Sequence, residues 1–134
     1  MWEKINKQSE ILFHNCLEKK LTVTTAESCT GGMIASSIVS VSGSSAIFKS
    51  SVVTYSNEMK SKILNIPLKS INENGAVSKV IAYTMAYNVL DLMNSDISIA
   101  VTGIAGPGGG SKNKPVGLVY ICLLYTSDAA DEGL

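Results

Sequence analysis

The chain has 134 residues and a formal net charge of zero at pH 7, which fits one domain large enough to bury its own core. Only 16% of the residues are charged, below the usual ~25%, so much of the surface is apolar or small and a homodimer is expected. All the basic residues are lysines, whose mild surplus before the acidic end suits a small anionic ligand but does not indicate a nucleic-acid groove, and no nucleic-acid partner is expected.

Helical and strand-like patterns alternate along the chain. A helical stripe begins at Trp2, and an alternating β-rich segment follows it. Ser56 or Asn57 is expected to cap one later helix and Ser78 another, and Pro67 and Gly75 are expected to interrupt the chain between them. The expected elements are a helix over residues 2–19, a strand over 21–26, a helix over 33–41, a strand over 48–55, a helix over 57–65, a helix from 79 to about 92, and strands over 97–102 and 116–124.

This order predicts an α/β fold, a three-layer arrangement in which helices pack on a small, mostly parallel sheet. The last two strands are expected to pair antiparallel, because the segment between them is too short for a crossover helix. In open α/β sheets, ligands bind beyond the C-terminal ends of the strands. Residues 27–32, 54–60 and 102–111 follow three strands and are rich in Gly, Ser, Thr and ionisable groups, so we expect a small-molecule site there.

The sequence offers few residue types that could form a histidine-based catalytic site, a metal site or a disulfide framework. His14 falls outside the apolar stripe of its helix and is expected to be solvated, which argues against a histidine-based triad. The three cysteines form no metal-binding spacing, so no metal or disulfide framework is expected. No apolar run approaches the ~20 residues of a membrane span, and the charged N-terminus does not resemble a signal peptide. We therefore expect a cytoplasmic protein that needs no cofactor.

Two glycine-containing loops are candidates for ligand binding. In residues 102–111, glycine N–H groups can approach a phosphate or carboxylate, with Thr102 adding a hydroxyl, although the loop matches no known phosphate-binding motif. In residues 27–32, Ser28, Cys29 and Thr30 precede a helix whose N-terminus can attract an anion. For this second loop, simple capping and close helix–sheet packing explain the residues equally well.

A serine and a lysine are the candidates for acid–base chemistry. A partly buried lysine with a lowered pKa can activate a serine in place of histidine. Lys60 lies near the start of a predicted helix, close to Tyr55, but a solvated helix lysine is the more common situation. Ser28, Ser44 and Ser45 are all chemically possible nucleophiles, and the residues alone do not choose between them.

The motifs TVTTAESCTGG, SGSSAIF, VVTYSNEMK, NGAVS, TGIAGPGGG and KPVGLVY occur in the order and spacing of the C-terminal domain of CinA, the competence/damage-inducible family. The resemblance covers roughly residues 10–121. It implies similarity to stand-alone nicotinamide-nucleotide amidases (PncC-type), which hydrolyse nicotinamide mononucleotide to nicotinate mononucleotide and ammonia. A non-catalytic nucleotide-binding domain and an inactive fragment are the alternatives.

The resemblance also implies roles for individual residues. It matches Ser45 to the nucleophile, Lys60 to the general base and Tyr55 to a proton-handling or orienting partner. The groups expected to contact the substrate are Ser28, Thr30, Gly31, Thr102, Gly103, Gly106 and Gly108.

The resemblance stops near residue 121. Relatives continue with another strand, a terminal helix and a Gly-Asp-Arg motif. We therefore expect residues 1–124 to form an amidohydrolase domain that lacks its C-terminal part, and residues 125–134 to be an unrelated tail. The missing helix is expected to leave apolar sheet surface exposed.

Overall fold

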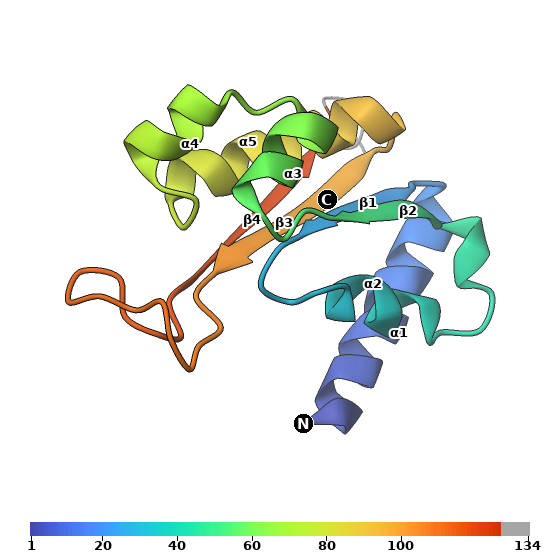
Figure 1. Ribbon diagram of the computed structural model, residues 1–134. Helices are drawn as coiled ribbons and strands as arrows, with labels where there is room; N and C mark the ends of the chain where they lie inside the picture. The colour runs from blue at the N-terminus through green and yellow to red at the C-terminus, as the bar shows by residue number, and fades with distance from the viewer. Residues whose placement is uncertain (127–134) are drawn as a thin grey trace.

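The computed structural model describes residues 1–126; residues 127–134, which make up most of the expected tail, lie outside the described residues. Helices and strands alternate through most of the chain (Figure 1). In chain order the elements are α1 (Trp2–Lys19), β1 (Val23–Glu27), α2 (Met33–Val39), the short 3₁₀ helix η1 (Ser44–Ala46), β2 (Phe48–Val53), α3 (Asn57–Leu64), α4 (Leu68–Asn74), α5 (Lys79–Met93), β3 (Ile97–Gly103) and β4 (Val119–Tyr125).

The four strands form one sheet in the order β2-β1-β3-β4. β1 pairs parallel with both β2 and β3, whereas β4 runs antiparallel to β3. In Figure 1, α1 and α2 lie on one face of the sheet, and α3, α4 and α5 lie on the other. The predicted α/β fold, with its mostly parallel sheet and antiparallel last pair, is confirmed.

Two of the helix starts follow from single serines. The Ser56 hydroxyl accepts a hydrogen bond from the Met59 N–H, and the Ser78 hydroxyl accepts one from the Ile81 N–H. Each bond satisfies a donor that the first turn of a helix leaves unpaired. Ser56, one of the two candidate caps of α3, and Ser78, the predicted cap of α5, are confirmed as caps.

The prediction missed the helices η1 and α4, and it placed the starts of β1 and β4 too early, at residues 21 and 116. α4 (Leu68–Asn74) occupies a segment for which only a turn was expected. Its seven residues are too few to show helical periodicity, and it fits between Pro67 at its N-cap and Gly75 at its C-cap. β4 begins at Val119 rather than at residue 116, because Gly117 (φ 93°) turns the chain back so that the Ile104 N–H reaches the Leu118 carbonyl.

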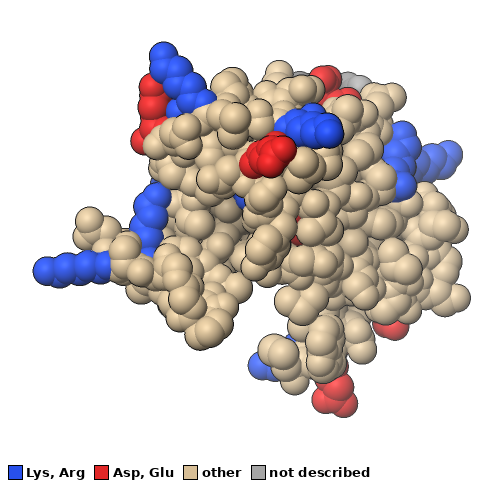
Figure 2. Space-filling view, viewed as in Figure 1, with Lys and Arg blue, Asp and Glu red and all other residues tan. Residues whose placement is uncertain are grey.

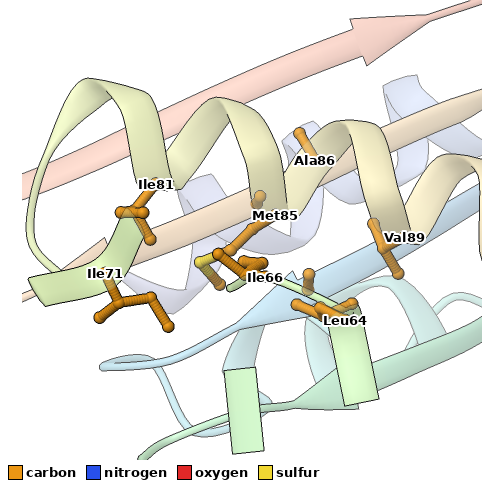
Figure 3. Packing of buried hydrophobic residues seen from close by; sticks show 9 residues of the cluster. Leu64, Ile66, Ile71, Ile81, Met85, Ala86 and Val89 are labelled. Atoms are coloured by element: carbon orange, nitrogen blue, oxygen red, sulfur yellow. The ribbon is translucent and has the colours of Figure 1, made fainter. Parts of the chain in front are cut away.

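Each face of the sheet has its own core. The larger one lies between the sheet and α3, α4 and α5, and Figure 3 shows its side chains converging there. It is built mainly from Leu64, Ile66, Ile71, Ile81, Met85, Ala86 and Val89, with Ala26 and Ala100 from the strands. The second core joins α1 and α2 to the opposite face, and His14 is exposed beside it as expected.

The face that carries α1 and α2 is covered only in part. In β4 the side chains of Val119, Ile121, Leu123 and Tyr125 are exposed. Because residues 119–125 pair with residues 97–103, these side chains lie on the same face as Ile97 and Ile99 of β3. The exposed apolar sheet surface that was expected is therefore present in the described residues.

Lysines are spread around the rim of the face drawn in Figure 2 rather than gathered into one patch. Across residues 1–126, no helix is long and apolar enough to cross a membrane.

Candidate active site

The candidate site lies where β1 and β2 end. These strands are parallel, so the segments that follow them leave the sheet at the same edge. The Ser28 N–H bonds to the Val101 carbonyl and the Thr54 N–H bonds to the Glu27 carbonyl, which extends the pairing one residue beyond each strand. This pairing brings the start of the 28–32 loop against the 54–60 segment, as the sequence predicted.

Lys60 is a buried lysine at this edge. Only 1% of its surface is exposed, although it belongs to the short amphipathic helix α3. Its Nζ donates to the Ser28 Oγ at 2.9 Å, to the Thr54 carbonyl at 2.9 Å and to the Tyr55 carbonyl at 3.3 Å. The side chain therefore points toward the end of β2, and the solvated alternative is excluded.

Burial is the largest influence on the Lys60 ammonium and lowers its pKa, while the nearby Cys29 side chain, where it is ionised, acts in the opposite direction. The three acceptors around Nζ are uncharged oxygens, so none of them compensates the positive charge. A lysine held in this way is more readily deprotonated than one in water. Its neutral amine can then take a proton from the hydroxyl 2.9 Å away.

Ser28 is the serine that the structure places against this lysine. It lies at a strand-to-helix turn and is 6% exposed. Ser44 is also buried, but its hydroxyl donates to the Val39 carbonyl. Ser45 is exposed in η1, before β2 begins, whereas the Lys60 Nζ bonds to the Thr54 carbonyl, just after β2 ends. A strand of six residues is about 20 Å long, so the structure does not bring Ser45 to Lys60.

Glu27 is a site residue that the sequence analysis did not single out. It is fully buried, and its carboxylate accepts hydrogen bonds from the N–H groups of Gly32, Ile34 and Ala35 and from the Thr30 hydroxyl. Thr30 and the N-terminus of α2 are therefore already occupied within the chain. An acidic residue shortly before a helix start was the available signal, because helix N-termini attract carboxylates.

The remaining candidates are only partly brought together. Tyr55 contributes its carbonyl to Lys60, while its side chain is exposed. The buried Thr102 hydroxyl donates to the Ala76 carbonyl at 2.8 Å and so ties β3 to the NGAVS segment. Gly31 donates its N–H to the Ser28 carbonyl. Gly106 and Gly108 belong to the loop that projects from the end of β3 (Figure 1).

Gly103 is in close contact with the candidate site. A Cβ atom placed there would lie 2.8 Å from the Leu118 carbonyl and 2.9 Å from the Cys29 Sγ. We expect Gly103→Ala to lower the free energy of unfolding by about 1–3 kcal/mol, the usual cost of overpacking. Chemical denaturation measures this change. Gly108→Ala is the matched control, because a Cβ there meets nothing within 4 Å; equal losses in both variants would contradict the packing argument.

Cys29 follows Ser28 directly, but its chemistry differs. Burial is the largest influence on its thiol and raises the pKa of Cys29 above its usual value. At neutral pH the side chain is therefore a protonated thiol, a poor nucleophile. Its position against Gly103 agrees with the packed small residue that the sequence analysis favoured.

Comparison with known proteins gives one consistent family. The family model of the CinA C-terminal domain matches residues 5–132. The chain is 53% identical over 115 residues to a CinA-like protein of Prochlorococcus marinus strain MIT 9515, and 59% identical over 105 residues to one of Endomicrobium trichonymphae. These matches cover 86% and 78% of this chain but only 27% and 24% of the relatives. The chain thus spans about a quarter of the length of these relatives.

Solved structures agree with this assignment. The competence/damage-inducible protein CihA of Agrobacterium tumefaciens superposes with a TM-score of 0.88 at 40% identity, covering 90% of this chain and 73% of that one. A competence damage-inducible protein A from Klebsiella pneumoniae gives a TM-score of 0.87 at 31% identity, covering 90% and 75%. Both the sequence and the fold are those of this family.

Proposed function

The chain belongs to the CinA C-terminal domain family, and from this premise we propose that it is an amidohydrolase that uses Ser28 as nucleophile and Lys60 as general base. The observation that carries the proposal is the 2.9 Å contact between the Ser28 Oγ and the Nζ of a fully buried lysine. Ser28 replaces Ser45, which the family resemblance had suggested, because Ser45 lies at the far end of β2. The proposed substrate is nicotinamide mononucleotide, as that resemblance implies.

The proposed reaction proceeds through an acyl-enzyme. Neutral Lys60 takes the proton of Ser28, and the Oγ attacks the carboxamide carbon. When the C–N bond breaks, the Lys60 ammonium returns the proton to the departing ammonia. Water, deprotonated by the same amine, then attacks the ester, releases the carboxylate product and restores Ser28.

A tetrahedral intermediate also needs donors for its oxyanion. The Cys29 N–H belongs to the residue after the proposed nucleophile at a strand-to-helix turn, the position that supplies such a donor in other serine hydrolases. The helix N-terminus that follows is less suitable, since the Glu27 carboxylate already accepts from its N–H groups.

The direct test follows nicotinate mononucleotide and ammonia by chromatography after incubation of this chain with nicotinamide mononucleotide. We expect product from the natural chain, at least about 10³-fold less from Ser28→Ala, and near-natural turnover by Ser45→Ala. Thermal melts would establish that both variants are folded. Full activity in Ser28→Ala would exclude the proposed nucleophile, whereas binding without turnover by the natural chain would favour the non-catalytic alternative.

A further inference from the structure

The Glu27 carboxylate accepts hydrogen bonds from five groups. Oε1 receives the Thr30 hydroxyl at 2.7 Å, the Ile34 N–H at 3.0 Å and the Gly32 N–H at 3.2 Å. Oε2 receives the Ala35 N–H at 2.9 Å and the Thr25 hydroxyl at 3.3 Å. All five donors are neutral, so this buried acid is stabilised without a cationic partner among them.

Through these hydrogen bonds Glu27 holds the chain on both sides of the proposed nucleophile, Ser28. The main chain of Glu27 belongs to β1, where it pairs with Val53 on one side and Val101 on the other. Its side chain reaches forward to residues 30–35 and holds the first turn of α2. Ser28 and Cys29 lie between these two anchors, so the turn that carries Ser28 is fixed at both ends.

The conformation of the 28–35 turn agrees with these hydrogen bonds to Glu27. The Gly31 N–H bonds to the Ser28 carbonyl, and the Met33 N–H bonds to the Thr30 carbonyl. Gly31 and Gly32 have positive φ values of 59° and 104°, so the chain doubles back toward the carboxylate. The opposite side of the turn presents the Ser28 Oγ to Lys60.

We propose that Glu27 is a positioning residue for the reaction: its carboxylate locks the 28–35 turn so that the Ser28 Oγ stays within hydrogen-bond reach of Lys60. This inference rests on the proposed function, and it assigns a role to a residue that has no contact with Lys60 in the hydrogen-bond network described above. A carboxylate is required because both oxygens accept. The carboxamide of glutamine would present an NH₂ group either to Ala35 or to Gly32 and Ile34.

The test compares three variants of the full chain. Glu27→Gln keeps the shape and loses one acceptor, Glu27→Asp keeps the charge and shortens the reach, and Glu18→Gln makes the same chemical change at an exposed acid of α1. We expect kcat to fall about 10- to 100-fold in Glu27→Gln and less in Glu27→Asp, with KM within about threefold of the natural value. Glu18→Gln should keep kcat within about threefold.

A second readout does not require the proposed substrate. Methanesulfonyl fluoride would modify Ser28 by forming an Oγ–S bond as the S–F bond breaks, fluoride leaves and Lys60 takes the proton. Mass spectrometry gives the rate of this labelling. We expect Glu27→Gln to slow it in proportion to kcat, after correction for the folded fraction measured by circular dichroism.

The outcomes separate this inference from the proposed function. Lys60-dependent labelling of Ser28 without amide turnover would rule out the proposed substrate. The labelling rates of the Glu27 variants would still test the positioning role of Glu27. Labelling at the natural rate in folded Glu27→Gln would overturn the positioning role. Failure of both Glu27 variants to fold would also overturn it, because the carboxylate would then serve the stability of the domain as a whole.

Discussion

Lys60→Met is expected to lower kcat for amide hydrolysis by about 10²–10⁴-fold, the usual contribution of a general base. Methionine fills much of the buried space but cannot accept the Ser28 proton or return it to the leaving group. Lys62→Met is the matched control, because Lys62 is exposed on the same helix and should be dispensable. Steady-state kinetics on the three proteins measure the effect, and similar losses in both variants would contradict a specific role for Lys60.

The activity of the natural chain should also rise with pH through the lowered pKa of Lys60, because only the neutral amine acts as a base. This rise of activity with pH should be absent from the residual activity of Lys60→Met. If Lys60→Met shows the same rise of activity with pH, the titrating group is not Lys60.

The free energy of unfolding should also depend on pH through the titration of Lys60. Burial lowers the pKa of Lys60 in the folded state, while the unfolded chain keeps a value near 10.4. Between those two values the unfolded state binds more protons, so raising the pH stabilises the folded state. The natural chain should therefore gain stability relative to Lys60→Met across that window. Thermal melts over pH measure the difference, and a constant difference would mean that the pKa of Lys60 is not lowered.

The regular part of the fold was predictable because local signals decide it. Serine caps start α3 and α5, alternation marks the strands, and the short β3–β4 segment requires an antiparallel pair. α4 escaped prediction because a seven-residue helix between Pro67 and Gly75 depends on packing rather than on a pattern.

The site was less predictable, since tertiary burial decides it. Lys60 precedes the buried Leu64 by one helical turn, but a lysine on the buried side of a short helix looks like a solvated one in sequence. The position of Glu27 shortly before a helix start was a signal for a capping carboxylate, but the sequence does not show that the turn folds back on it. Ser45 lies close to Lys60 in sequence but is separated from it in space by the length of β2.

Ile66→Ala tests how the core supports this site. Ile66 follows α3, is fully buried, and lies with Leu64 and Met85 in the larger core (Figure 3). We expect the free energy of unfolding to fall by about 2–5 kcal/mol, the cost of lost burial plus a cavity. Ile63→Ala, near the end of α3, is the matched control: its side chain is 36% exposed, and the change should cost less than about 1 kcal/mol. Urea denaturation compares the two, and equal losses would contradict the assignment of Ile66 to the core.

The same variant separates anchoring from chemistry. Lys60 reaches Ser28 from α3, and Leu64 and Ile66 hold the end of that helix against α5. Nζ itself is fixed by Ser28, Thr54 and Tyr55 rather than by the isoleucine. At a temperature where Ile66→Ala is folded, kcat should therefore stay within about threefold of the natural value while stability falls. A loss of kcat as large as that of Lys60→Met would show instead that the core sets the Ser28–Lys60 geometry directly.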